Sequence, residues 1–316
     1  MVEKLVLAIE GSFETGNIDL YTILSTYNFG FWFNGYRGYV VVDEGIPVVA
    51  EVYVDGRYRI YSPENRSCSE CLERLSWILG LEEDLGDFHR RGSSDPLLGS
   101  FIRKYSGWRL RTTSLWWALV TGICQQNASF RQGWRMLYNI IKLYGRRASI
   151  GDVDVLLPPT PRDILDNKSL LVNAGTGYRG ETIYRVAKAF TEGTIDQGSI
   201  AKLSSKRIEE ELKRIKGVGS YTARLAMTLA LRKYDLPPID RWVARIVEEA
   251  YGVSSKDAEG EWRRRWGRWG GLAVIALTIT LDAKPLSKAL ERIRNKQLLP
   301  VENGEPTPLN LWRYYS

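Results

Sequence analysis

Residues 207–224 read RIEEELKRIKGVGSYTAR, and this stretch decides the fold of the longer part of the chain. Apolar residues recur at helical spacing before and after Gly217-Val218-Gly219, so the pattern predicts two helices joined by a sharp turn. The glycines allow the backbone to approach a ligand closely, and free N–H groups at the start of the second helix can bind a phosphate. Lys216 adds a cation beside the turn. The alternative is a plain helical hairpin that needs glycine only for its bend.

A second informative stretch lies about twenty residues further on. Residues 236–245 read LPPIDRWVAR, with Pro238 two positions before Asp240 and an amphipathic pattern after it. Aspartate is a common first residue of a helix because its carboxylate accepts free backbone N–H groups. Taken alone, Asp240 is therefore expected to be a helix cap.

Together the two stretches resemble the helix-hairpin-helix superfamily of DNA glycosylases. In that family a K/P-G-V-G-x-x-T-A hairpin is followed by a loop with proline two positions before an aspartate that opens a helix. The resemblance covers roughly residues 95–282, and its pattern extends to the first ninety residues. It is nearest to the branch of the alkyladenine and 8-oxoguanine glycosylases, in which a small antiparallel sheet domain precedes the helices.

Further segments match the same family. Residues 123–129, ICQQNAS, resemble the segment that inserts a side chain into the gap left by an extruded base, which puts Asn127 at that position. Residues 175–179, GTGYR, resemble the family's glycine-rich G-x-G-Y-R loop. Residues 266–273, WGRWGGLA, resemble the opening of its last core helix.

The chain as a whole is expected to have an α+β fold. Aromatic and β-branched runs, including residues 29–33, predict strands in the first ninety residues, and Asn34-Gly35 and Asp55-Gly56 are typical turns of antiparallel hairpins. Beyond residue 95 the pattern predicts helices almost to the end. The expected division is an N-terminal antiparallel sheet domain with helices over residues 1–92, a helical helix-hairpin-helix catalytic domain over 93–300, and a C-terminal tail over 301–316.

Composition limits the chemistry. The 316 residues carry a net charge of +7, which favours a polyanionic partner. One histidine and three cysteines cannot build a multi-histidine metal centre or a four-cysteine cluster. Cys68 and Cys71 are read as a local disulfide or two ordinary thiols, in preference to a redox pair or half of a zinc site with His89. No apolar run reaches eighteen residues, so we expect no membrane partner and a location in the cytoplasm or nucleoid. We also expect a monomer.

The resemblance implies a reaction and the residues that carry it. Asp240 is expected to be the catalytic carboxylate that stabilises the positive charge developing on the sugar as the N-glycosidic bond breaks. Bifunctional members carry a lysine at the position of Tyr221, and a phenol cannot form their Schiff base, so we expect a monofunctional enzyme that leaves an abasic site. The expected base pocket consists of Tyr221, Trp116, Trp117, Leu225 and Thr278.

The identity of the substrate rests on departures from each branch. Val274 falls where 8-oxoguanine enzymes use glutamine, and Thr278 stands where both branches often carry a base-stacking aromatic. With the lysine absent, an alkylated purine such as 3-methyladenine is favoured. The alternatives are an 8-oxoguanine-type glycosylase and a non-catalytic helix-hairpin-helix DNA-binding protein.

The expected partner is double-stranded DNA that contains damaged bases. No cofactor is expected to be required, although Na⁺ or K⁺ could bind at the backbone of Ile215 and Val218, as it does in family hairpins. The residues expected to contact DNA are Lys216, Gly217, Val218, Gly219, Ser220, Asn127, Arg241 and Arg268.

Overall fold

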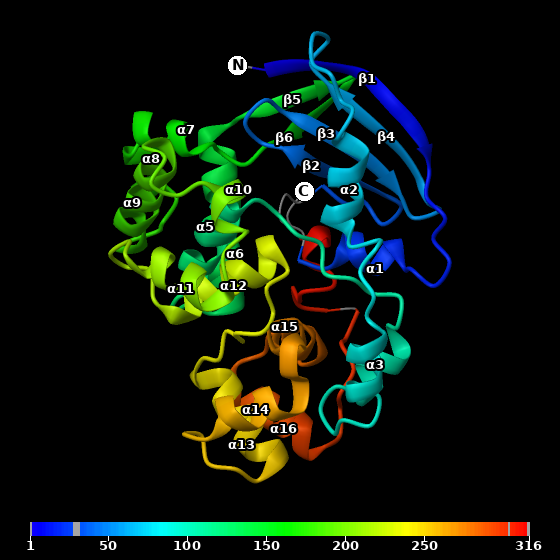
Figure 1. The fold of residues 1–316 in the computed structure, drawn as a ribbon, viewed down its shortest axis with the longest axis vertical. Helices are drawn as coiled ribbons and strands as arrows, with labels where there is room; N and C mark the ends of the chain where they lie inside the picture. The colour runs from blue at the N-terminus through cyan, green and yellow to red at the C-terminus, as the bar shows by residue number, and fades with distance from the viewer. Residues whose placement is uncertain (1, 28–31, 303, 315–316) are drawn as a thin grey trace.

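The computed structural model describes residues 2–27, 32–302 and 304–314. A twisted sheet forms one end of the molecule, and helices lie beside and below it (Figure 1). The α+β fold predicted from the sequence is therefore confirmed.

The sheet has six strands in the order β2-β3-β4-β1-β5-β6. Strands β3 and β4 form an antiparallel hairpin around Asp55-Gly56, as predicted, and Gly56 has a φ of +97°, which favours glycine. Of the predicted strand over residues 29–33, residues 29–31 lie outside the described part of the chain, and Phe33 forms a single bridge with Gly38. The strands are β1 Val2–Ser12, β2 Arg37–Asp43, β3 Val48–Tyr53, β4 Arg57–Ser62, β5 Arg147–Ile150 and β6 Val153–Leu156.

Two of these strands come from the segment that the sequence pattern assigned to helices. β1 pairs antiparallel with β4 on one side and parallel with β5 on the other, and β6 forms the edge. The prediction of helices almost to the end is therefore wrong for residues 147–156. These strands have only four residues each, too few for a clear alternation; β5 is stabilised by pairing with β1, and β6 by pairing with β5.

The helices follow the predicted order. Ser114 caps α5 by accepting the amide of Trp117, and α5 packs along α12 in the centre of the largest hydrophobic core.

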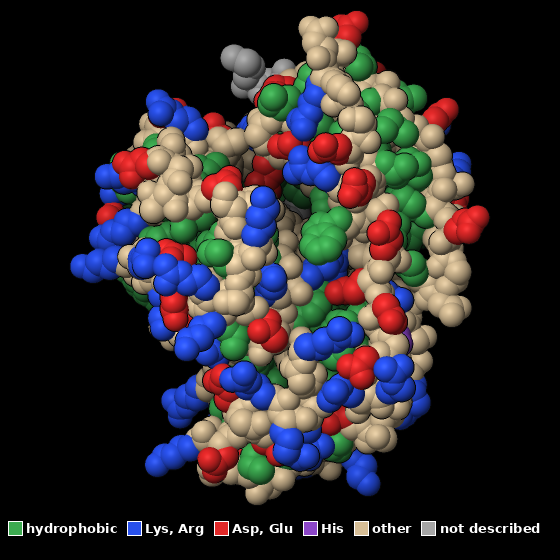
Figure 2. All heavy atoms as spheres, in the orientation of Figure 1, with side chains coloured by type: hydrophobic (Ala, Val, Ile, Leu, Met, Phe, Trp, Pro, Cys, Tyr) green, Lys and Arg blue, Asp and Glu red, His purple; other side chains and the backbone are tan. Residues whose placement is uncertain are grey.

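Figure 2 shows Lys and Arg side chains widely distributed over this helical part of the molecule. The helices are α1 Leu20–Ser25, α2 Cys71–Leu79, α3 Gly86–Gly92, α4 Gly99–Lys104, α5 Leu115–Gln125, α6 Phe130–Tyr144, α7 Pro161–Asp166, α8 Ser169–Asn173, α9 Arg179–Thr191, α10 Gln197–Ile200, α11 Ser205–Lys213, α12 Ser220–Leu231, α13 Arg241–Tyr251, α14 Ala258–Trp266, η1 Gly267–Trp269, α15 Gly270–Thr280, α16 Leu286–Arg294 and η2 Leu311–Arg313.

The end of the chain returns to the sheet. Leu311 is buried, and the ring of Trp312 lies 5.0 Å from that of Phe33, so the C-terminal segment packs against the N-terminal part. Cys68 and Cys71 form a disulfide immediately before and at the start of α2. None of the helices in the described ranges has the length and apolar character needed to cross a membrane.

Candidate active site

The hairpin between α11 and α12 is built around Gly217. Its φ is +102°, and a Cβ at this position would lie 2.2 Å from Oγ1 of Thr182, so both the backbone and the packing require glycine. Gly219 is the N-cap of α12 without a side-chain cap, and nothing lies within 4 Å of its ideal Cβ position. The hairpin thus presents open backbone, with the amides of the first turn of α12 available to an anion. Lys216 is exposed beside it.

Asp240 is the N-cap of α13, as its position in the sequence predicted. Its Oδ1 accepts the amide of Val243 at 2.8 Å. Burial raises the pKa of the carboxyl, and hydrogen bonds from backbone N–H groups, first that of Val243, oppose this shift. The carboxylate also lines a cavity, so the side chain that caps α13 is in reach of a ligand in that cavity.

The cavity beside Asp240 has two adjacent parts that share lining residues. The outer part measures about 510 Å³ and the inner part about 80 Å³. Residues of α5, α6, α12 and α15 and the loop before α13 line both parts; they are Gln125, Phe130, Tyr221, Val274, Thr278 and Pro238. The side chains of the hairpin helix and of the last long core helix therefore meet next to the buried carboxylate.

Aromatic rings enclose the inner part of the cavity. Tyr27, Phe130, Trp134 and Tyr221 line it, and the ring of Phe130 lies 5.9 Å from that of Trp134 in an edge-to-face contact. The side-chain amide of Gln125 faces the same space, and its buried Nε2 has no hydrogen-bond partner among the described residues. A planar ring with a polar edge would satisfy both features.

Sequence reasoning missed most of these walls. Phe130 and Trp134 stand four residues apart on α6 directly after the ICQQNAS segment, and this spacing was the signal that could have found them. Tyr27 comes from a distant part of the chain, which no local pattern indicates. Trp242 also lines the outer cavity, with its indole N–H donated to the carbonyl of Lys284 at 2.9 Å.

The structure brings three predicted pocket residues to this cavity and leaves two elsewhere. Tyr221, Leu225 and Thr278 line the inner part. Trp116 and Trp117 do not line either part: Trp117 is fully buried, and the indole of Trp116 donates to the carbonyl of Pro159 at 2.8 Å. Their assignment to the base pocket is corrected, because they lie in the first turn of α5, whereas the residues of α5 that line the cavity, Thr121 and Gln125, lie further along the helix.

Three loops that are far apart in the sequence meet at the mouth of the cavity. Arg179 of the G-x-G-Y-R loop donates to the carbonyl oxygens of Gln126, at 3.0 Å, and Asn127, at 3.2 Å. The side-chain amide of Gln126 in turn donates to the carbonyl oxygen of Gly217 at 3.1 Å. Asn127 is exposed with a φ of +46°, so the insertion candidate stands beside the hairpin on a fixed loop.

Of the other residues predicted to contact DNA, two lie beside the hairpin or Asp240 and one does not. Ser220 begins α12, and Arg241, the first residue of α13, is exposed next to Asp240. Arg268 instead lies over the ring of Trp269 at 4.6 Å, and no described contact ties it to the hairpin. In the hairpin turn the carbonyl of Ile215 accepts the amide of Val218 at 3.0 Å. Cation binding at this turn stays a prediction.

The C-terminal segment contributes an unexpected wall. Glu305 and Pro306 line the outer cavity. The carboxylate of Glu305 pairs with Lys284 at 2.9 Å and with Arg131 at 2.8 Å, and these charges hold the segment beside α6 and α16. The tail is thus part of the candidate site.

The fold is that of solved DNA glycosylases, and the sequence is similar to that of a DNA-3-methyladenine glycosylase, so the comparisons agree with the resemblance found in the sequence. No family model matches the chain. A DNA-3-methyladenine glycosylase of Bacillus subtilis (strain 168) is 27% identical over 210 residues, which cover 62% of this chain and 67% of that protein.

Two solved structures share the fold. The 3-methyladenine DNA-glycosylase of Archaeoglobus fulgidus superposes with a TM-score of 0.69 at 21% identity, over 85% of this chain and 97% of that one. The 8-oxoguanine glycosylase/lyase of Clostridium acetobutylicum, in complex with double-stranded DNA containing cytosine opposite 8-oxoguanine, gives 0.68 at 20% identity, over 92% and 99%. At these identities the superpositions establish the fold.

Proposed function

We propose that this protein is a monofunctional DNA repair glycosylase that extracts a damaged base from duplex DNA and hydrolyses its N-glycosidic bond. The observation that carries the proposal is the position of Asp240, a half-buried carboxylate that lines the outer part of the cavity, which shares six lining residues with the aromatic-walled inner part. The similarity to a DNA-3-methyladenine glycosylase supports it.

The site suits each step of that reaction. The exposed hairpin amides would hold a phosphate beside the lesion, and Asn127 would fill the gap left by the extruded nucleotide. The base would enter the inner cavity while its sugar stays in the outer part, next to Asp240. The ionised carboxylate stabilises the positive charge that develops on the sugar and orients the attacking water.

An alkylated purine suits the inner cavity better than 8-oxoguanine does. Alkylation makes a purine electron-poor and positively charged, and faces of aromatic rings attract such a ligand. Tyr27, Phe130, Trp134 and Tyr221 supply these faces. Val274 lines both parts of the cavity, and its side chain has no polar group that could form a hydrogen bond with the edge of 8-oxoguanine. We therefore favour a substrate such as 3-methyladenine.

One set of assays tests the function. Duplexes carrying 3-methyladenine, 1-methyladenine, 8-oxoguanine, hypoxanthine or uracil are incubated with the protein, and abasic sites are then cleaved with alkali. Release of an alkylated purine is expected. Salt-sensitive binding to all duplexes without any base release would instead identify a non-catalytic DNA-binding protein.

The aromatic residue at position 221 predicts the absence of a covalent intermediate. Tyr221 has no amine to attack the sugar, and burial raises the pKa of its phenol, so the group stays neutral. Borohydride added during turnover should trap no protein on DNA, although free abasic sites accumulate. Efficient trapping would show a lyase lysine elsewhere and would refute the monofunctional mechanism.

The unpartnered amide of Gln125 predicts a role in selecting the base. In Gln125→Leu, the preference among bases that differ in hydrogen-bonding edge should fall by about tenfold, because a polar contact to the bound base is lost. The matched control is Gln297→Leu, at an exposed position outside the cavity. Relative rates of release from the five duplexes measure the effect, and an unchanged ranking with unchanged ratios would remove Gln125 from base recognition.

A further inference from the structure

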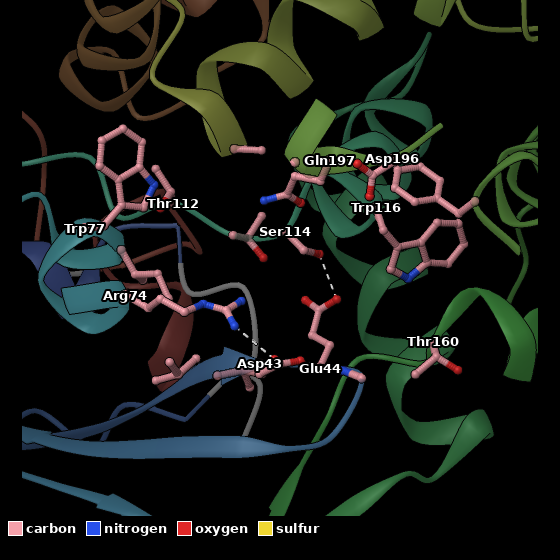
Figure 3. Close-up of a pocket in the computed structure, with 18 of the residues that line it drawn as sticks. Asp43, Glu44, Arg74, Trp77, Thr112, Ser114, Trp116, Thr160, Asp196 and Gln197 are labelled. Carbon is pink, nitrogen blue, oxygen red and sulfur yellow. Dashed lines mark hydrogen bonds and ion pairs between the residues drawn. The ribbon is translucent and has the colours of Figure 1, made fainter. Parts of the chain in front are cut away.

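A second cavity, of about 910 Å³, lies between the turn that joins β2 to β3, helix α2, the start of α5 and helix α10 (Figure 3). It shares no lining residue with the cavity beside Asp240. Helix α5 lies between the two cavities: Trp116 lines this one and Thr121 lines the inner part of the cavity beside Asp240, about 7.5 Å further along the helix. It is therefore a separate site.

The charge of this second cavity opposes that of the protein. Five acidic side chains and one basic side chain line it, although the whole chain carries +7. The basic one, Arg74, is already paired with Asp43 at 2.9 Å. The acidic ones are Asp43, Glu44, Glu70, Glu73 and Asp196. A nucleic acid would be repelled here, and a cation would be attracted.

An exposed tryptophan adds a second kind of attraction for a cation. Trp77 and Trp116 lie on opposite sides of the cavity, with Glu44 between them and pointing inward (Figure 3). The side chain of Trp77 is 53% exposed, and the guanidinium of Arg232 lies 5.3 Å from its ring, whereas Trp116 is 3% exposed and forms a buried wall. Indole faces bind ammonium and guanidinium groups, and their apolar surface packs against the attached hydrocarbon chain.

Glu44 points into the cavity, and its side chain has a single hydrogen-bond partner among the described residues. Its Oε2 accepts the hydroxyl of Ser114 at 2.7 Å, and no described residue donates to Oε1. Desolvation raises the pKa of this carboxyl to about 7; Ser114, Arg146 and Arg74 lower it, while Asp43 raises it further. A cation inside the cavity would supply the missing partner and favour the ionised form.

We propose that this cavity binds an organic cation, an alkylammonium group carried by a free polyamine or by a lysine side chain of a partner protein, with the ring of Trp77 beside it and Glu44 as its counter-ion. The site is independent of the glycosylase reaction. The carboxylates of the rim hold further ammonium groups of the same ligand. The remainder of the basic protein repels such a ligand, which confines it to this cavity.

Calorimetric titration of the full chain, without DNA, tests the proposal. Spermidine and the peptide acetyl-Lys-Lys-Lys-amide carry the same charge, and magnesium chloride at equal ionic strength controls for screening. One equivalent of spermidine or of the peptide should bind. Higher affinity for spermidine would identify a free polyamine as the ligand, and higher affinity for the peptide would identify a lysine side chain of a partner protein. No stoichiometric binding by either, or equal binding of magnesium, would overturn the proposal.

Variants locate the binding. Glu44→Gln, which can still accept the hydrogen bond of Ser114, should lower the affinity for the cation by at least about tenfold. Trp77→Ala should lower this affinity several-fold. Glu14→Gln removes the same charge at an exposed position outside the cavity and should leave binding unchanged. Unchanged binding in both cavity variants, with melting temperatures like that of the wild type, would refute the site.

Proton release tests the role of Glu44 separately. At pH 6 the wild type should release a proton on binding, because the cation ionises a carboxyl whose pKa is about 7. Titrations in buffers of different ionisation enthalpy measure this release, which should be absent in Glu44→Gln. The same release in that variant would show that Glu44 is not the counter-ion.

Discussion

Asp240→Asn should lower the rate of base release by at least about 100-fold while leaving affinity for lesion-containing DNA largely unchanged. Asparagine caps a helix as well as aspartate does, so the hydrogen bond to the amide of Val243 and the start of α13 are retained. Only the negative charge beside the sugar is lost. Single-turnover release of 3-methyladenine and equilibrium binding to the same duplex measure the two quantities.

The control for this variant is Asp19→Asn. Asp19 caps α1 by accepting the amide of Thr22 and does not line the cavity, so the same chemical change there should leave base release unaltered. Near-normal release by Asp240→Asn would end the assignment of Asp240 as the catalytic carboxylate, whatever the control shows.

The buried environment of Asp240 also predicts a pH dependence. Burial raises its pKa above the 3.8 of an ordinary aspartate, and only the ionised form stabilises the positive sugar. The rate constant for base release should therefore fall as the pH is lowered through this raised pKa, and should do so at a higher pH than an exposed aspartate would require. In Asp240→Asn the residual rate should lack this acid limb. A residual rate with the same limb would assign the limb to another group.

Gly217→Ala should destabilise the fold by about 1–3 kcal/mol and weaken binding to undamaged and damaged duplexes alike. The new Cβ would lie 2.2 Å from Oγ1 of Thr182, and the φ of +102° is strained for any residue with a side chain. Both effects move the turn that places the hairpin amides. Thermal unfolding and DNA titrations at fixed salt report the two consequences.

Gly219→Ala is the matched control, two residues away in the same turn. Its backbone is extended, with a φ of −98°, and its ideal Cβ meets nothing within 4 Å, so its melting temperature should stay close to that of the wild type. The double variant Gly217→Ala with Thr182→Ala separates the two causes, because it removes the clash and keeps the strained φ. Equal melting temperatures for Gly217→Ala and Gly219→Ala would refute the structural role of Gly217.

Local sequence predicted the elements of the site that act through neighbouring residues. The hairpin and the cap at Asp240 depend on hydrogen bonds between residues three or four positions apart. The same locality explains the error at residues 147–156. Strands β5 and β6 are defined by pairing with each other and with β1, which comes almost 150 residues earlier.

The walls of the cavity could be predicted only in part. Tyr221 and Leu225 follow the hairpin on α12, so their direction was fixed once the hairpin was recognised. Trp116 and Trp117 looked equally suitable because a helical pattern shows which side of a helix is apolar, but not which end of it meets a cavity. Tyr27 reaches the inner part from the N-terminal segment by a tertiary contact.

The sequence by itself determined the hairpin, the aspartate that opens α13 and the class of fold, because backbone conformation and capping are set by short-range interactions. Only the tertiary structure decided which aromatic rings surround the cavity beside Asp240, that Gln125 faces it without a partner, and that Glu44 lies between two tryptophans in a second cavity. These features arise where helices and strands distant in the chain pack together. Their side chains carry no shared local pattern, so packing alone reveals them.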